Sequence, residues 1–290
     1  MDQPTHCGQQ SLFDEHTDPV VVPVQVGRSK VSTTHTKTAL TRASGFMSSY
    51  NYTLNPYSGC TFGCSYCYAA FFASSDERQA DWGNWVEVKT NTLEVLRRMR
   101  TDLRGKTVYM SSVTDPYQPV ERHLGLVREL LIELLNRGVR LVVQTRSTLV
   151  VRDIDLLQQF EHVRVNMTVS TDSRRVQKVF EPKCPSPNRR LRAISEVHSA
   201  GIKACITMTP LLPIENPTLF VSDLQRTGIE HFVVQPFHTA KGRFVAGTQA
   251  KAFRLIDEMG WTDDDYRRIV TLMRTSLPRV DEGREGFAPE

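Results

Sequence analysis

The chain alternates between short β-branched apolar runs and longer stretches with helical spacing. A strand–helix–strand alternation favours a parallel sheet with right-handed crossovers. We therefore predict an α/β fold in which about six parallel strands curl into a partial TIM-like barrel. The apolar runs that predict these strands are residues 52–57, 107–111, 139–145, 163–169, 202–208 and 229–235.

One amphipathic stretch gives the clearest helix prediction, over residues 124–137. Its leucines recur at positions that form one stripe of a helix, and Gly138 follows as a stop signal before the next strand. Similar stripes predict helices over 90–103 and 189–200, the second of which ends before Gly201.

The regular pattern occupies only the middle of the chain. Residues 1–42 lack sustained periodicity, which predicts a disordered tail followed by a strapping segment. Residues 43–236 form the predicted barrel core. Residues 237–290 are predicted to be a C-terminal extension that covers the barrel mouth, with a helix-like stretch at 266–274.

Composition predicts where the protein is located but does not identify its partners. The six cysteines show no disulfide framework, the amino terminus has no signal-like apolar region, and no apolar run approaches membrane-spanning length. We therefore expect a soluble, cytoplasmic protein with no membrane partner. The net charge is +4, and arginine clusters fit either solvated helix faces or phosphate contacts. The clusters are Arg97, Arg98, Arg100 and Arg104; Arg174, Arg175 and Lys178; and Arg189, Arg190 and Arg192.

The most informative chemistry lies in the segment 55–68, where Cys60, Cys64 and Cys67 have the spacing C-x3-C-x2-C. A cubane iron-sulfur cluster normally takes four cysteines, so three leave one iron free to bind another ligand. Gly59 and Gly63 permit close backbone approach or positive φ. The neighbouring aromatic residues would limit solvent access to a cluster; they are Tyr57, Phe62, Tyr66 and Tyr68.

A zinc site is the alternative interpretation of the same cysteines. His35 or His123 could then supply a fourth ligand. Structural zinc loops favour C-x2-C pairs with a second pair elsewhere, and the sequence has no second pair.

The motif resembles the signature of the radical SAM enzymes, C-x3-C-x-aromatic-C, with Tyr66 in the aromatic position. The resemblance runs from about residue 37 to 236. It implies a barrel of six βα units, a [4Fe-4S] cluster on the three cysteines, and S-adenosylmethionine (SAM) on the open iron. It also implies one-electron cleavage of SAM to a 5'-deoxyadenosyl radical, and therefore a reductant such as flavodoxin or ferredoxin.

Within that superfamily, the string Asn-Pro-Tyr-Ser-Gly-Cys at 55–60 resembles the spore photoproduct lyase-like branch. Further matches follow the predicted strands, including the Phe-Glu-Pro of 180–182. The resemblance implies cofactor contacts from the residues at the matching positions. These are Tyr66, Thr114, Asp115, Arg146 and Ser170. Arg146 takes the place of a lysine that meets the SAM carboxylate.

One position departs from the lyases. They have a hydrogen-donating cysteine where this chain has Ser112, which puts photoproduct reversal by that route in doubt. Tyr117 and Cys205 are the candidate catalytic residues that could replace it, although a buried cysteine is often only a small hydrophobe.

A separate motif lies in the predicted tail. Residues 9–13, Gln-Gln-Ser-Leu-Phe, resemble the peptide by which bacterial repair and replication proteins dock on the DNA sliding clamp. A disordered segment of this kind can insert Leu12 and Phe13 into an apolar pocket while Gln9 and Ser11 lie at its rim.

The leading functional hypothesis is thus a radical SAM enzyme that acts on a nucleic acid base, as in DNA repair. Radical modification of a peptide, RNA or small molecule is the alternative among enzymes. A non-enzymatic iron-sulfur or zinc protein is the alternative from another class.

The clamp motif gives the first testable prediction. Replacing Leu12 and Phe13 with alanine removes the two apolar anchors and is expected to abolish sliding-clamp binding in a pull-down assay. SAM cleavage by the same variant should stay intact. Unchanged clamp binding would contradict this prediction.

Overall fold

The computed structural model describes residues 21–237 and 249–289. The clamp-like peptide at 9–13 lies outside the described residues. An eight-stranded sheet dominates the fold, with the strand order β12-β11-β10-β9-β8-β7-β4-β3. Its members are β3 (Leu40–Arg42), β4 (Tyr52–Leu54), β7 (Thr107–Met110), β8 (Arg140–Thr145), β9 (Val163–Thr168), β10 (Lys203–Met208), β11 (His231–Val234) and β12 (Arg279–Glu282).

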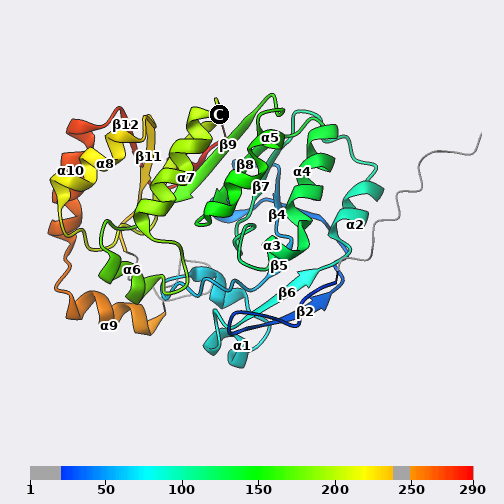
Figure 1. Ribbon diagram of the computed structural model, residues 1–290, viewed down its shortest axis with the longest axis horizontal. Coiled ribbons are helices and arrows are strands. Elements are labelled where there is room, and N and C mark those ends of the chain that lie inside the picture. The colour runs from blue at the N-terminus through cyan, green and yellow to red at the C-terminus, as the bar shows by residue number, and fades with distance from the viewer. Residues whose placement is uncertain (1–20, 238–248, 290) are drawn as a thin grey trace, which may run out of the picture.

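All neighbours in this sheet pair parallel except β3, which pairs antiparallel with β4. The predicted run of parallel strands is confirmed from β4 to β11, in sequence order. The parallel strand β12 was not predicted, because Arg279–Glu282 carries only one apolar residue. Figure 1 shows the curved sheet with helices α4, α7, α8 and α10 along its outer side.

Alternate residues of the central strands explain the two faces of the sheet. Leu141, Val143 and Val165 belong to the main apolar core under the helices. Their neighbours Gln144 and Thr168 contact each other on the opposite, lumen-facing side. The sheet is therefore apolar toward the helices and partly polar toward the barrel lumen.

The helix predicted over 124–137 is divided in two. Gly125 adopts φ 62° and separates α3 (Glu121–Leu124) from α4 (Leu126–Asn136). Leu130, Leu131 and Leu134 of α4 are fully buried. The other helices are α1 (Asp76–Ala80), α2 (Thr92–Arg98), α5 (Ile154–Leu157), α6 (Arg174–Phe180), α7 (Pro187–Ser199), α8 (Pro217–Arg226), α9 (Ala250–Glu258) and α10 (Asp263–Ser276).

A four-stranded sheet lies beside the barrel, in the order β1-β2-β6-β5. Its strands are β1 (Gln25–Val26), β2 (Ser29–Thr34), β5 (Tyr57–Ser58) and β6 (Trp85–Lys89). Because β5 immediately precedes Cys60, this sheet supports the start of the cysteine loop. The strand β2 comes from the predicted strapping segment and pairs with β6.

The C-terminal part of the chain reaches both ends of the barrel lumen. Ala252 and Ile256 of α9 pack in an apolar cluster with Cys60 and Cys64. Phe287 packs in another cluster that includes Tyr109 and Val142, nearer the amino ends of the strands. The division into tail, core and extension at residues 42 and 236 stays a prediction.

None of the helices in the described ranges combines the length and the apolar character that a membrane span needs.

Candidate functional site

The cysteine loop, residues 59–67, is held by close backbone packing. Gly59 has φ +76°, and a Cβ there would lie 2.5 Å from the ring of Trp85. Gly63 has φ +61° and packs on Gly83, where an added Cβ would lie 2.6 Å from the Cα of Gly63. The prediction that both loop glycines serve close approach and positive φ is confirmed.

The three thiols of the loop lie in a protected environment. Cys60 and Cys64 are buried, and Cys67 is partly buried. Burial raises the pKa of Cys60 well above its ordinary value and the pKa of Cys67 to about 11. The pKa of Cys64 is lowered instead, chiefly by its hydrogen bond with Cys184. Binding of iron as thiolate would therefore release protons from Cys60 and Cys67.

The donor set fits a cubane cluster better than a single ion. Within the described part of the chain, no three His, Cys, Asp or Glu side chains gather as one metal ion requires. His35 and His123 thus do not complete a zinc site with these cysteines. In a cubane each cysteine binds a different iron, so its ligands need not converge. The buried hydroxyls of Thr61 and Ser65 have no hydrogen-bond partner among the described residues, and they can donate to cluster sulfur atoms.

Thr114 and Asp115 were predicted to contact the cofactor. In this structure their side chains form hydrogen bonds mainly with backbone groups. Thr114 Oγ1 donates to the carbonyl of Gly59 at 2.6 Å. The carboxylate of Asp115 accepts from Thr145 Oγ1, Arg146 N and Tyr117 N. Burial raises the pKa of Asp115, although these hydrogen bonds oppose that shift. Both residues therefore connect the loop after β7 to its neighbours.

Gln118 is a supporting residue that sequence reasoning missed. It is fully buried, and its Oε1 accepts from Thr61 N at 2.9 Å. Its Nε2 donates to Thr114 Oγ1 and to the carbonyl of Gly59. The side chain braces the cysteine loop from inside. A single glutamine between two prolines carries no periodic signal that would have revealed this role.

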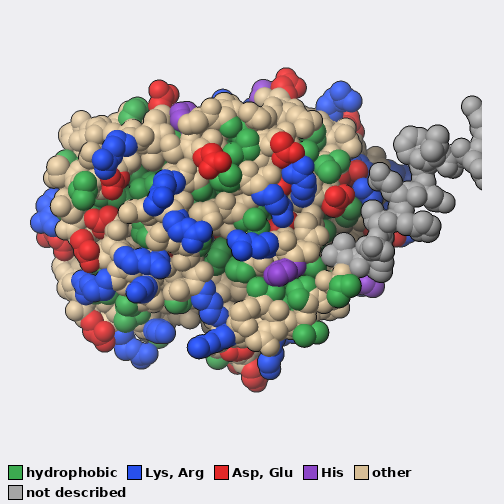
Figure 2. Space-filling view, in the orientation of Figure 1, with side chains coloured by type: hydrophobic (Ala, Val, Ile, Leu, Met, Phe, Trp, Pro, Cys, Tyr) green, Lys and Arg blue, Asp and Glu red, His purple; other side chains and the backbone are tan. Residues whose placement is uncertain are grey.

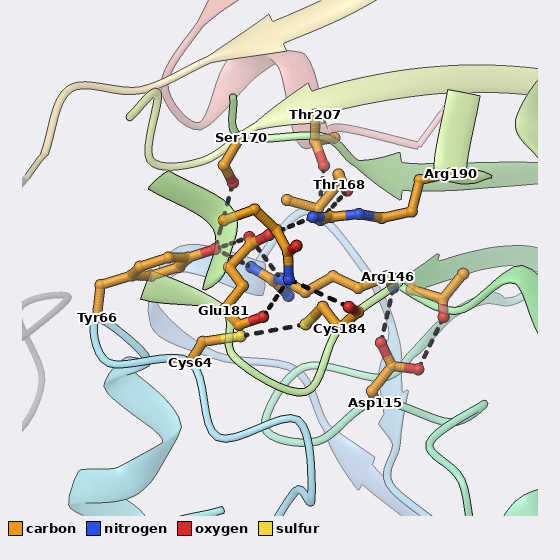
Figure 3. A network of polar contacts seen from close by, with 12 residues as sticks. Cys64, Tyr66, Asp115, Arg146, Thr168, Ser170, Glu181, Cys184, Arg190 and Thr207 are labelled. Carbon is orange, nitrogen blue, oxygen red and sulfur yellow. Dashed lines mark hydrogen bonds and ion pairs between the residues drawn. The ribbon is translucent and has the colours of Figure 1, made fainter. Parts of the chain in front are cut away.

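Three predicted cofactor residues meet next to Cys64 (Figure 3). The guanidinium carbon of Arg146 lies 5.7 Å from the ring centroid of Tyr66, and its Nη2 lies 3.4 Å from the tyrosine oxygen. The hydroxyl of Tyr66 lies 3.2 Å from Ser170 Oγ. The structure thus brings Arg146, Tyr66 and Ser170 together, from the ends of β8 and β9 and from the loop itself.

A buried ion pair supports this group. Glu181 and Arg190 have fully buried side chains and pair directly, and Tyr66 donates a hydrogen bond to Glu181. Burial alone would raise the pKa of Glu181, but Arg190 and Arg146 hold it below its ordinary value. Glu181 is thus a structural partner of an arginine in the core. From the sequence, Arg190 was grouped with arginines on a helix face. Its side chain is instead fully buried, where it pairs with Glu181 and donates to the carbonyl of Thr168.

Tyr117 and Cys205, the candidate catalytic residues, lie apart from this group. Tyr117 is fully buried in the main core, and the cation of Arg152 lies 5.9 Å from its ring centroid. Burial and nearby Asp153 raise its pKa well above its ordinary value. Cys205 is buried in the apolar cluster that contains Phe287. The catalytic roles of both residues stay predictions.

Ser112 lies at the start of the loop after β7. Its Oγ lies 3.3 Å from Asn55 Nδ2, and its carbonyl accepts a hydrogen bond from Tyr68. The backbone amides of Ser112 and Val113 donate to Asn55 Oδ1, both at 3.0 Å. Asn55 therefore fixes the segment in which the lyases have their cysteine.

Comparison with known proteins agrees with this geometry. The model of the radical SAM superfamily matches residues 54–225, more than half of the chain. The chain therefore belongs to the radical SAM superfamily. An uncharacterized protein of Methanocaldococcus jannaschii is 35% identical over 162 residues, which are 56% of this chain and 61% of the relative. An uncharacterized protein of Mycobacterium tuberculosis is 30% identical over 171 residues, 57% of this chain and 50% of the relative. The chain thus spans between half and two thirds of the length of these relatives.

Solved structures show the same fold. A cysteine-to-serine variant of spore photoproduct lyase has a TM-score of 0.62 at 14% identity and covers 92% of this chain and 87% of its own. Another variant, with bound AdoMet and dinucleoside spore photoproduct, has a TM-score of 0.61 at 14% identity, with 90% and 86% coverage. At this identity the likeness concerns the fold, and it confirms the predicted lyase-like barrel.

The packing of the cysteine loop gives a prediction. Gly83→Ala would place a methyl group against Gly63, whereas Gly105→Ala adds one in open space; φ is positive at both, +101° at Gly83 and +69° at Gly105. Gly105→Ala therefore carries a backbone cost of about 1–2 kcal/mol without a clash. Only Gly83→Ala is expected to displace the loop and lower the iron bound after anaerobic reconstitution. Equal iron content in the two variants would contradict this role of the packing.

The buried ion pair gives another prediction. Glu181→Gln leaves the cation of Arg190 uncompensated in the core and is expected to cost about 3–5 kcal/mol of unfolding free energy. Glu94→Gln is the control, because Glu94 and its partner Arg98 are 56% and 78% exposed and the expected loss is about 1 kcal/mol or less. Urea denaturation at neutral pH measures both. Similar losses would show that Glu181 and Arg190 do not act as a buried pair.

Proposed function

We propose that this protein is a radical SAM enzyme that uses a [4Fe-4S] cluster and acts on a nucleic acid base. One observation carries the cofactor assignment. Arg146 and Ser170 lie directly against Tyr66 of the cysteine loop, although both are far from it in the sequence. The thiols of Cys60, Cys64 and Cys67 would hold the cluster.

When bound, a reduced cluster with one open iron supplies the electron that cleaves SAM to methionine and a 5'-deoxyadenosyl radical. The chain's own residues would bind and orient SAM. Arg146 has a side chain that is 20% exposed, so its cation can meet a carboxylate while Glu181, 3.7 Å from its Nε, holds it in place. The hydroxyls of Ser170 and Tyr66 can accept or donate hydrogen bonds beside it. Helix α9 packs over the cysteine loop and limits access of water.

The lumen offers polar groups that suit a base. Gln144 Nε2 donates to Thr168 Oγ1 at 2.8 Å and to Thr207 Oγ1 at 3.1 Å, and its Oε1 accepts from Tyr109. This amide is held in one orientation and is partly exposed, and its oxygen keeps one acceptor site that can take a hydrogen bond from the edge of a planar base. The likeness to a lyase structure with bound dinucleoside spore photoproduct supports the same substrate class.

The surface adds limited support for a nucleic acid substrate. Figure 2 shows Lys and Arg side chains over the face that carries α6 and α7, with acidic side chains between them. The clamp-like peptide at 9–13 would bring the enzyme to DNA that is being copied or repaired. A flavodoxin- or ferredoxin-type protein would supply the electron. We place the protein in the cytoplasm, where thiols stay reduced.

Ser112 favours a reaction other than simple photoproduct reversal. A serine O–H is much harder to break homolytically than a thiol S–H, so Ser112 cannot return a hydrogen atom as the lyase cysteine does. The substrate could therefore be a different modified base. The alternative is radical modification of a peptide, RNA or small molecule. A substrate screen would distinguish this alternative from action on a DNA base.

The test of this function has two stages. Anaerobic reconstitution is expected to give a brown protein with about four irons. Dithionite and SAM should then release 5'-deoxyadenosine from the wild type and not from Cys64→Ala. Damaged oligonucleotides, nucleosides and peptides are next compared for substrate-dependent consumption of SAM.

Each stage has its own contradicting result. An iron-loaded protein that releases no 5'-deoxyadenosine would favour a non-enzymatic role. Release that responds to peptides or small molecules, and not to oligonucleotides, would contradict the assignment of a nucleic acid base.

A further inference from the structure

Cys184 lies against the cysteine loop although it is 117 residues beyond Cys67 in the chain. Its Sγ is 3.8 Å from Cys64 Sγ, and both side chains are buried. Figure 3 shows the two sulfur atoms facing each other beside Tyr66 and Arg146. The sequence assigned no role to Cys184.

The local structure fixes this position from several sides. Gln177 Nε2 donates to the carbonyl of Cys184 at 3.1 Å, and the amide of Cys184 donates to the carbonyl of Glu181. Lys183 Nζ donates to the carbonyl of Gly83, the same glycine that packs on Gly63 of the cysteine loop. Ser65 N donates to the carbonyl of Phe180 at 2.9 Å. The segment 180–184 and the cysteine loop therefore form one braced unit.

The chemistry of the two sulfur atoms decides which one donates. Cys64 belongs to the ligand motif and would bind iron as a thiolate, which can only accept hydrogen bonds. Cys184 lies outside the motif, so its thiol is the group of this pair that can donate. Its S–H is a weak donor, but in a buried site a weak hydrogen bond to an anion still has an electrostatic effect.

We infer that Cys184 is a positioning residue that donates a hydrogen bond to the Cys64 thiolate and raises the reduction potential of the cluster. Potentials of iron-sulfur clusters depend on hydrogen bonds to their sulfur atoms, because reduction adds negative charge that such donors stabilise. This inference rests on the proposed function only in requiring the cluster on the three motif cysteines.

A role as a fourth ligand is less consistent with the geometry. Two thiolates on one tetrahedral metal with bonds of about 2.3 Å would lie about 3.8 Å apart, so Cys64 and Cys184 could reach a single ion. In a cubane, however, each iron takes one protein ligand. No third His, Cys, Asp or Glu joins this pair at one point among the residues that the structure describes.

The test is a potentiometric titration of the reconstituted full-length protein, without SAM, followed by the EPR signal of the reduced cluster. Cys184→Ala removes the donor, Cys184→Ser keeps one, and Cys205→Ala is the control because Cys205 is a buried cysteine in a separate apolar cluster. At the wild-type midpoint, we expect the ratio of reduced to oxidised cluster to fall by about three- to tenfold in Cys184→Ala. Cys184→Ser should restore most of it, and Cys205→Ala should match the wild type.

Two outcomes would overturn the inference. The same midpoint in Cys184→Ala and the wild type would mean that Cys184 has no effect on the potential. Loss of iron from Cys184→Ala, with normal iron in Cys205→Ala, would mean that Cys184 is a ligand or only a structural residue. A wild-type protein without any cluster would instead contradict the proposed function.

Discussion

The rest of the site rests on one constraint, the close packing that holds the cysteine loop in shape. Gly59 lies against Trp85 and Gly63 against Gly83, with no room for a side chain at any of the three glycines. Gln118 then fixes the interior of the loop through the amide of Thr61. A loop built in this way can present three thiols toward one volume and still leave the fourth position open, as a catalytic metal centre requires.

Buried charge is the second feature that defines the site. Glu181 pairs with Arg190, accepts from Tyr66 and lies near Arg146, so two cations lie close to this one carboxylate. Removing such charges from water is unfavourable, and the hydrogen bonds among them offset part of that cost. Because Arg190 is the direct partner of Glu181, the cation of Arg146 can serve an anionic cluster or a carboxylate.

Much of the fold was predictable because the periodicity of apolar residues is visible within short stretches of the sequence. The runs from β7 to β11 are rich in β-branched residues and are separated by amphipathic stretches, so their order and parallel pairing followed. The strand β12 was missed because Arg279–Glu282 is mostly polar. The break at Gly125 was missed because a glycine inside an amphipathic stripe does not by itself end a helix.

The site was predictable only where a motif encoded it. The spacing of Cys60, Cys64 and Cys67 is local, and the family resemblance supplied Arg146 and Ser170. Gln118 and Cys184 could not be found in this way, because their contacts with the loop form only when distant segments fold together. The contacts of Thr114 and Asp115 with the cofactor stay a prediction, and their hydrogen bonds to Gly59 and Arg146 could not be predicted because they form only in the tertiary structure.

EPR spectroscopy of the reduced, reconstituted protein before and after addition of SAM tests most directly whether three cysteines hold a cluster with an open iron. A cluster held by three cysteines has an iron that SAM can reach, so we expect a cluster signal whose g-values or line shape change when SAM is added. The absence of a cluster signal, or a signal that SAM leaves unchanged, would contradict it.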